Sequence, residues 1–288
     1  MAIDVRAVAP EYDFGGAQFD MSQQRDREIV CFMLSQALFG EATGVYCGKS
    51  LYAARSLEAA RFYVRQARQE LAHLELFAEI FRQLGLEPVG PHWVVRLLSS
   101  HNNYYPFKVL MEHAIGEGMV LDIFRDVLLQ TLPDDHPAAA SIKKKLKVVC
   151  AEELEHVAWG EKEVRHMLAE NPSLARPFYG VVELQLAVLP YLVSAFERQA
   201  NGHPVLAHLR PFADHVARRV VKQSQDLGFY PRERPGSLGR YRAMAAGGAM
   251  FVRSQFARSH STLDKTYLAE LGFGRGNPPD AEAVADGA

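Results

Sequence analysis

The stretch Ala151-Glu152-Glu153-Leu154-Glu155-His156-Val157-Ala158-Trp159-Gly160 places a glutamate and a histidine three residues apart, at Glu153 and His156. On a helix, residues at positions i and i+3 lie on the same face. A carboxylate and an imidazole on one face can bind the same metal ion. The same spacing occurs earlier in the chain, at Glu70 and His73. Two such pairs predict two metal ions.

Composition favours a soluble protein with a large core. The chain has 288 residues, of which 48% are hydrophobic, and we expect one large domain with additions. The net charge of -2 argues against nucleic acid and against a membrane surface as partners. Residues 1–20 lack the basic start and apolar run of a secretory signal, and no apolar run of membrane-spanning length follows.

The three cysteines, Cys31, Cys47 and Cys150, form no C-x-x-C pair. This pattern disfavours a disulfide scaffold and a rubredoxin-type iron site. We therefore expect a reducing, cytoplasmic location.

Apolar residues at steps of three and four predict an all-α protein. We expect an irregular lead-in over 1–20, a helical domain over 21–271 and a disordered tail over 272–288. The metal-binding part of the domain covers 21–170, and additional helices cover 174–271. Long helices are expected at 21–48, 56–84, 105–132 and 138–170, with Gly85 as the C-terminal cap of the second.

Glu41 interrupts the apolar stripe of the first expected helix, with Leu38 one turn before it and Val45 one turn after it. A buried carboxylate is costly unless it is paired or bound to a cation. The alternative is that Glu41 lies at a water-exposed edge beside Gly40 and Gly44.

The third expected helix offers two glutamates. Glu117 shares a face with Leu121 and Phe124, whereas Glu112 follows a weaker apolar stripe, so we choose Glu117 as the inward residue. His113 lies one turn from Glu117. It is either a hydrogen-bonded core histidine or a partner or extra ligand of the site.

A single Glu-x-x-His pair arises easily by chance on a charged helix. The third such pair, Glu163 and His166, lies well round the helix from Glu153 and illustrates this risk. We interpret Glu152 and Glu155 as surface charges. Gly160 is either a tolerated helix glycine or a point where a neighbouring helix or a ligand approaches closely.

Two matching halves strengthen the prediction, because each half supplies one glutamate followed by a Glu-x-x-His pair. Together they offer four carboxylates and two imidazoles, from Glu41, Glu70, His73, Glu117, Glu153 and His156. We expect Glu70 and Glu153 to bridge the two ions. Oxygen and imidazole ligands without thiolates suit iron or manganese better than structural zinc.

These motifs, with the Glu117-Gly118 and His156-to-Gly160 contexts, resemble the ferritin-like di-iron carboxylate proteins over about residues 21–170. They are most similar to the oxygen-activating branch, which includes ribonucleotide reductase small subunits, aldehyde-deformylating oxygenases and di-iron N-oxygenases. The resemblance implies a ferritin-like four-helix bundle with additional C-terminal helices. It also implies that the six residues bind two iron ions, or one manganese and one iron ion.

Reductase small subunits place a radical-forming tyrosine one turn after the first motif's histidine, where this chain has Phe77. That residue cannot form a tyrosyl radical. Tyr46 and Tyr63 are near enough in the pattern to leave open whether another tyrosine does so.

The sequence of the C-terminal third predicts a further helix that covers the bundle. An apolar helix over 176–200, kinked at Pro190, would wall a substrate pocket. Glu183 in this helix is either an added ligand or a residue that has a polar neighbour or lies at an exposed edge of the helix. The basic amphipathic helix at 211–227 is either a docking face or a solvated one.

We therefore expect an enzyme that uses dioxygen to oxidise a small, apolar or carrier-bound organic substrate. Such an enzyme also needs an electron-donor protein, and the sequence leaves a homodimer open. The first alternative is an iron-handling or peroxide-reducing protein that uses the same site. The second is a metal-free helical interaction protein in which the two motifs are coincidental.

Overall fold

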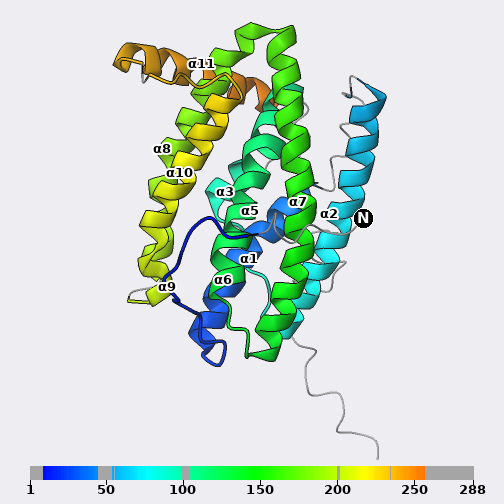
Figure 1. Ribbon diagram of the computed structural model, residues 1–288, viewed down its shortest axis with the longest axis vertical. Coiled ribbons are helices and arrows are strands. Elements are labelled where there is room, and N and C mark those ends of the chain that lie inside the picture. The colour runs from blue at the N-terminus through cyan, green and yellow to red at the C-terminus, as the bar shows by residue number, and fades with distance from the viewer. Residues whose placement is uncertain are drawn as a thin grey trace, which may run out of the picture.

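The structure is almost entirely helical. The computed structural model describes residues 9–44, 54, 56–98, 104–199, 202–233 and 235–256. These residues form helices, turns and loops without any β-strand, so the prediction of an all-α protein is confirmed (Figure 1). Within the same ranges we find no helix whose length and hydropathy would suit a membrane span.

Four long helical segments precede residue 171. Three are regular α-helices: α1 (Gln24–Gly44), α2 (Leu57–Leu84) and α7 (Pro137–Glu170). The short helix α3 (Trp93–Leu98) follows α2. The third segment covers 105–131 and alternates between α-helical and π-helical turns. It contains α4 (Tyr105–Lys108), η3 (Val109–Gly116), α5 (Glu117–Asp122), η4 (Ile123–Leu128) and α6 (Leu129–Thr131).

The bounds of α2 follow from its sequence. Ser56 precedes the helix and its hydroxyl oxygen accepts a hydrogen bond from the backbone N–H of Ala59. Gly85 ends the helix with φ of 66°, a left-handed conformation that glycine adopts without a steric penalty. The predicted cap at Gly85 is confirmed. The first Glu-x-x-His pair, Glu70 and His73, lies within the helix between these two ends.

Some predicted boundaries fall outside the described residues. The first helix, expected to reach residue 48, is described only as far as Gly44, and Cys47 and Tyr46 lie in the part that is not described. The expected lead-in is described over 9–20 and contains no helix. Residues 257–288, which include the predicted disordered tail, also lie outside the described ranges.

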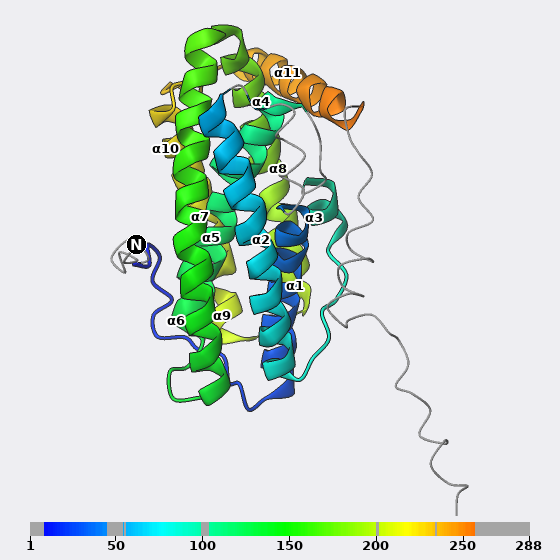
Figure 2. The ribbon, with the colours of Figure 1, turned by 90° about the vertical axis from the view of Figure 1, so that its right-hand side faces the viewer.

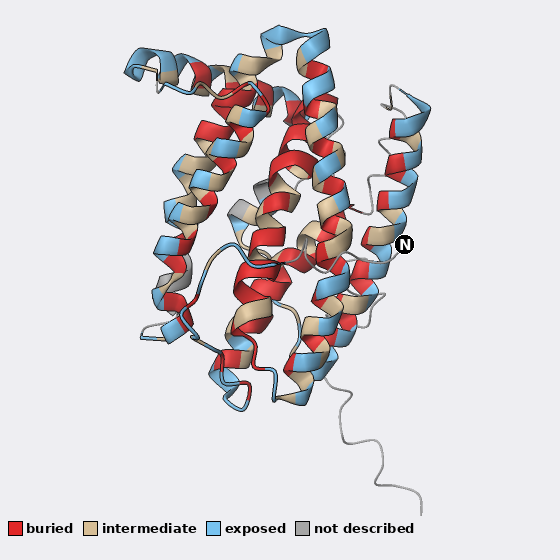
Figure 3. Ribbon diagram, viewed as in Figure 1, coloured by how far each residue is buried: buried red, intermediate tan, exposed pale blue. Residues whose placement is uncertain are grey.

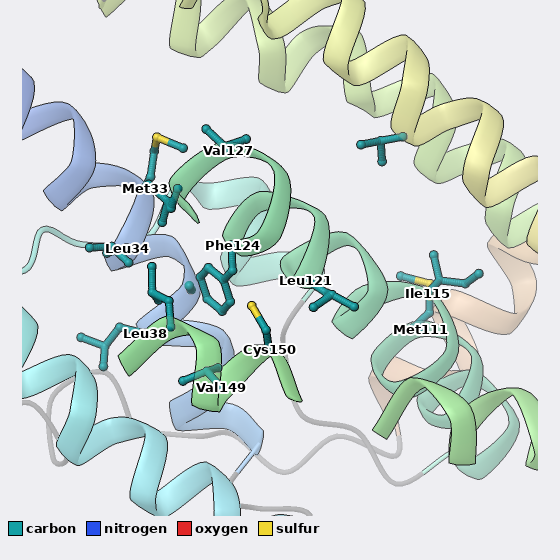
Figure 4. Close-up of a cluster of buried hydrophobic side chains, with 14 of the residues drawn as sticks. Met33, Leu34, Leu38, Met111, Ile115, Leu121, Phe124, Val127, Val149 and Cys150 are labelled. Atoms are coloured by element: carbon teal, nitrogen blue, oxygen red, sulfur yellow. The ribbon is translucent and has the colours of Figure 1, made fainter. Parts of the chain in front are cut away.

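The four segments share one hydrophobic core. α1 packs against α2, α2 packs against α7, and α7 packs against the third segment (Figure 2). Figure 4 shows Phe124 of the third segment near Leu34 and Leu38 of α1 and near Val149 and Cys150 of α7, and all five side chains are buried. Each large apolar side chain buried in this way contributes about 1.5–3 kcal/mol relative to its exposed state.

Further helices follow the four segments along the chain, as predicted. They are the 3-10 turn η5 (Pro172–Leu174) and helices α8 (Ala175–Gln199), α9 (Pro204–Ala207), α10 (Leu209–Asp226) and α11 (Ser237–Phe256). Helices α10 and α11 both pack against α8. Where α8 crosses α11, a Cβ added to Gly247 would lie 2.4 Å from the backbone carbon of Gly180. Glycine at this crossing therefore lets the two backbones touch.

Candidate metal centre

The six predicted site residues come together between α1, α2, the third segment and α7. Their ligand atoms form two groups within which all atoms lie within 4.8 Å of one another. The first group contains Glu41, Glu70, His73 and Glu153, and the second contains Glu70, Glu117 and His156. Glu70 belongs to both groups. Glu117 is partly exposed and the other five residues are buried, so the alternative of a water-exposed edge for Glu41 is wrong.

Two of the carboxylates each reach both imidazoles. Glu153 places Oε1 3.4 Å from Nδ1 of His73 and Oε2 3.4 Å from Nδ1 of His156. Glu70 places Oε2 3.6 Å from the first of these nitrogen atoms and Oε1 3.5 Å from the second. Donor atoms that share an ion at about 2.0–2.2 Å lie roughly 3 Å apart, close to these separations. This is the geometry expected of bridging carboxylates.

The other two carboxylates each reach only one of the two imidazoles of His73 and His156. Glu41 Oε2 lies 2.7 Å from Nδ1 of His73. Glu117 Oε1 lies 3.7 Å from Nδ1 of His156. The site therefore divides into two halves, each with one histidine and one carboxylate of its own.

The outer nitrogen of each histidine has an acceptor on the facing helix. His73 Nε2 lies 2.7 Å from Oε2 of Glu152, and His156 Nε2 lies 3.0 Å from Oε1 of Gln69. An acceptor at Nε2 keeps a proton there and turns the Nδ1 lone pair toward the carboxylates when a metal ion is bound. Both imidazoles are thus oriented as ligands.

The interpretation of Glu152 as a surface charge was wrong. Its side chain is only 32% exposed, and its hydrogen bond with His73 lowers the pKa of the carboxyl group, although partial burial opposes this. Sequence alone hid this contact, because it depends on how α7 is rotated against α2. Glu155 is exposed, as predicted.

A buried cluster of four carboxylates needs compensating positive charge. Burial raises the pKa of Glu41 and of Glu117 well above the usual value, and neighbouring carboxylates raise both further. Burial also raises the pKa of Glu70, but hydrogen bonds with His73 and Glu41 outweigh it and leave the value at about 2. Without metal, protons therefore supply part of the charge that two divalent ions would provide.

Protonation of His73 is part of this compensation. Burial lowers its pKa, but Glu41 and hydrogen bonds with Glu152 and Glu41 outweigh burial and raise the pKa well above its usual value. In the metal-free protein both ring nitrogens therefore carry protons. A metal ion binding at Nδ1 would release the inner proton, so metal binding should be favoured as pH rises.

Two buried atoms in the second half of the site have no hydrogen-bond partner among the described residues and could contact a cation. His156 Nδ1 makes no hydrogen bond with the described residues, although three carboxylate oxygens lie 3.4–3.7 Å from it. Glu117 Oε2 is also buried and without a hydrogen bond among them. An unsatisfied buried polar group costs about 1–3 kcal/mol, and a metal ion would satisfy both atoms. The residues present therefore fit a metal ion in the second half of the site.

The positions of Glu117 and Glu112 agree with the choice made from the sequence. Glu112 Oε2 lies 2.6 Å from Nζ of Lys108, within the third segment itself. Glu117 instead lies in the second ligand group. That Glu117 binds metal remains a prediction.

His113 is a buried neighbour of the site and belongs to neither ligand group. Its Nδ1 lies 3.2 Å from Oε1 of Glu117 and 3.2 Å from Nε2 of Gln66. Burial lowers its pKa to about 3, so the ring is neutral near pH 7. The structure thus favours the alternative of a hydrogen-bonded core histidine beside the site.

Gln66 is a site residue whose role the sequence did not predict. It is fully buried, and its Nε2 donates to Oε1 of Glu117 at 2.6 Å and to Oε1 of Glu70 at 3.3 Å. It therefore holds two candidate ligands from different helices. The sequence feature that could have identified Gln66 is its position as an uncharged polar residue in the apolar stripe, one turn before Glu70.

Gly160 lets the third segment approach α7, which favours the close approach of a neighbouring helix over a merely tolerated helix glycine. A Cβ added there would lie 2.6 Å from Cβ of His113 and 2.7 Å from the backbone nitrogen of Ala114. The contact falls in η3, the π-helical turn that leads into Glu117. π-helical turns inside α-helices occur often at functional sites.

Glu183 lies away from the ligand groups. Its carboxylate accepts hydrogen bonds from the hydroxyl of Tyr230 at 2.6 Å and from Nη2 of Arg240 at 2.7 Å. These contacts connect α8 to α11 and to the loop before α11. They support the interpretation of Glu183 as a polar residue with polar neighbours rather than as an added ligand.

The third Glu-x-x-His pair does not form a site. Glu163 accepts a hydrogen bond from the hydroxyl of Tyr105, and His166 is 55% exposed beside Glu170. Neither residue belongs to a ligand group. This placement agrees with the sequence analysis, in which the pair Glu163 and His166 illustrated that the spacing can arise by chance.

Comparison with known proteins gives this chain no family: no family model matches it, and neither the curated proteins nor the solved structures contain a match. The structure itself shows a helical protein with a buried cluster of carboxylates and histidines. That cluster is compatible with a di-iron site.

Proposed function

We propose that the chain is a ferritin-like protein whose four-helix bundle binds two iron ions, or one manganese and one iron ion. The observation that carries this proposal is the shared position of Glu70 and Glu153, each of which offers one oxygen to each imidazole. Glu41 and His73 would complete the first ion's ligands. Glu117 and His156 would complete those of the second.

The donor set supports this choice of metal. Carboxylate oxygens and imidazole nitrogens suit iron and manganese, and neither of the two described cysteines, Cys31 and Cys150, belongs to a ligand group. Cys150 is buried in the core one turn before Glu153, and burial and then Glu153 raise the pKa of its thiol to about 12. It stays protonated near pH 7, which disfavours thiolate ligation.

We further propose that the protein is an oxygen-dependent enzyme acting on a small, apolar or carrier-bound organic substrate. A pair of reduced iron ions supplies electrons to dioxygen when bound at such a site. Five of the six candidate ligands are buried, which favours the dry surroundings that this chemistry needs. Phe62 lies 5.8 Å from the ring of His156 and stacks on Trp159 at 3.7 Å, so aromatic rings cover this side of the second half.

Metal content per chain tests the proposal. The protein is loaded anaerobically with ferrous iron, desalted and analysed, and two ions per chain are expected. Glu153→Ala should lose most of this metal, because Glu153 reaches both imidazoles, and His73→Ala should lose the ion of the first half. His166→Ala is the matched control, since it removes the exposed histidine of the third pair.

Oxygen consumption then separates the functions. An oxygenase consumes oxygen faster when a reductant and a suitable organic substrate are both present. An iron-handling protein would instead turn over iron or peroxide without any organic substrate. A parent protein that retains no stoichiometric metal under these conditions would overturn the proposal and favour a metal-free helical protein.

A further inference from the structure

The outer face of α2 exposes three large apolar side chains in one row. Leu57 is 67% exposed, Val64 56% and Leu71 46%. Their seven-residue spacing corresponds to about two helical turns, so they lie along one stripe. Exposed apolar rows of this kind mark interaction surfaces more often than isolated apolar residues do. Figure 3 shows exposed residues along this outer side of α2.

Three arginines accompany the apolar row. Arg61, Arg65 and Arg68 are exposed, and none forms an ion pair within the described part of the chain. Two acidic residues of the same helix are already engaged, Glu58 with Lys162 at 2.7 Å and Glu79 with Lys145 at 3.4 Å. The middle of α2 therefore carries three arginines whose charges form no ion pair within the described residues.

This surface lies one side chain away from the candidate metal centre. Arg65 sits 5.9 Å from the ring centroid of Phe62, and the same ring lies 5.8 Å from that of His156. Gln69, the residue after Arg68, hydrogen-bonds His156 at 3.0 Å. An electron donor bound here would be separated from a candidate ligand by one residue.

We propose that this basic apolar face docks an acidic electron-donor protein. The face consists of Leu57, Arg61, Val64, Arg65, Arg68 and Leu71. The inference rests on the proposed function, because only a redox centre needs such a donor. Each donor molecule would give up one electron and be oxidised, and one ferric ion in the site would be reduced to ferrous.

Charge argues against a second copy of the chain as the occupant. A two-fold pairing centred on Val64 would place Arg61 and Arg68 opposite the same arginines of the other copy. Like charges placed face to face cost binding energy. An acidic partner instead complements the arginines, while its apolar residues cover the row between them.

Docking is tested first with metal-free protein, so that failure of docking and failure of metal binding remain distinguishable. The probe is an oxidised, fluorescently labelled plant-type [2Fe–2S] ferredoxin, an acidic one-electron carrier. We expect binding at low salt that weakens steeply as salt is added. The triple variant R61E/R65E/R68E should raise Kd at least tenfold.

The matched control is R218E/R232E/R242E, which changes the same charge on exposed residues of α10, α11 and the loop between them. Helix α2 and these helices lie on opposite sides of the molecule (Figure 1). The control should leave Kd within about twofold of the parent at moderate salt. Unchanged melting temperatures in both variants exclude a folding defect as the cause.

Reduction kinetics extend the test to the iron-loaded protein. Reoxidation of reduced ferredoxin by oxidised, loaded protein should slow about tenfold in R61E/R65E/R68E, with the iron content unchanged. The proposal is overturned if the parent does not bind ferredoxin at low salt, or if both triple variants behave alike. A parent that dimerises through this face, with V64D monomeric, would assign the surface to a second copy instead.

Discussion

Glu152 Oε2 lies 2.7 Å from Nε2 of His73, and Gln69 Oε1 lies 3.0 Å from Nε2 of His156. Glu152 immediately precedes Glu153, and Gln69 immediately precedes Glu70. The residue before each Glu-x-x-His motif therefore orients the histidine of the other motif. Because α2 and α7 exchange these contacts, neither histidine can turn without disturbing the facing helix.

Removing these outer acceptors should weaken metal binding while leaving the ligands in place. We expect Glu152→Ala to lower the affinity at the His73 half, and Gln69→Ala that at the His156 half, by about 10–100-fold each. Competition with a chelator of known affinity measures the effect. Glu155→Ala is the control, because Glu155 is exposed on the same helix. Equal affinities for all three variants would contradict the proposed orientation.

Loss of the shared carboxylate should differ from loss of a terminal one. Glu70 belongs to both ligand groups, whereas Glu41 belongs only to the first. We therefore expect Glu70→Ala to lose both ions and Glu41→Ala to retain close to one ion per chain. Metal analysis after anaerobic loading distinguishes them. Identical losses in the two variants would show that the division into two halves is wrong.

Adjacent glycines in α11 should respond oppositely to alanine. At Gly247 an added Cβ would lie 2.4 Å from the Gly180 backbone, whereas at Gly248 it would meet no atom of the described residues within 4 Å. Gly247→Ala should destabilise the fold by about 1–3 kcal/mol through overpacking. Gly248→Ala should stabilise it by about 0.5–1 kcal/mol, because alanine loses less chain entropy in a helix. Urea unfolding measures both, and destabilisation by Gly248→Ala would contradict the packing described.

Glu183 should make stability depend on pH in the acid range. Partial burial raises its pKa, but hydrogen bonds from Tyr230 and Arg240 outweigh burial and lower the pKa below 4.5. Its stabilising contribution is therefore fully present above the unfolded pKa and is lost as pH falls through the folded pKa. In Glu183→Gln this part of the acid destabilisation should disappear.

Urea unfolding at several pH values measures this effect. The stability difference between the parent and Glu183→Gln should be constant near neutral pH and should shrink below about pH 4.5. A difference that grows on acidification would contradict the assigned sign. Glu155→Gln, an exposed carboxylate on α7, is the control.

Much of the site followed from local pattern. Glu70, His73, Glu153 and His156 were predicted from i, i+3 spacing, and Glu41 from its place in an apolar stripe. The structure brings the candidate ligands of all four helical segments together, although metal binding itself remains a prediction. Glu152 was misassigned because the same periodicity that turns Glu153 inward turns its neighbour toward the helix edge. Whether an edge faces water or another helix is not a local property.

The all-α class, the end of α2 at Gly85 and the side chains that share a helix face could all be predicted from the amino-acid sequence. These depend on interactions within a few residues, such as caps and the 3.6-residue period. The packing of the helices adds three features: Glu152 contacts His73, Gln66 joins Glu117 to Glu70, and π-helical turns precede Glu117. Those features depend on the rotation and offset of helices distant in sequence, which side-chain packing sets and no local pattern encodes.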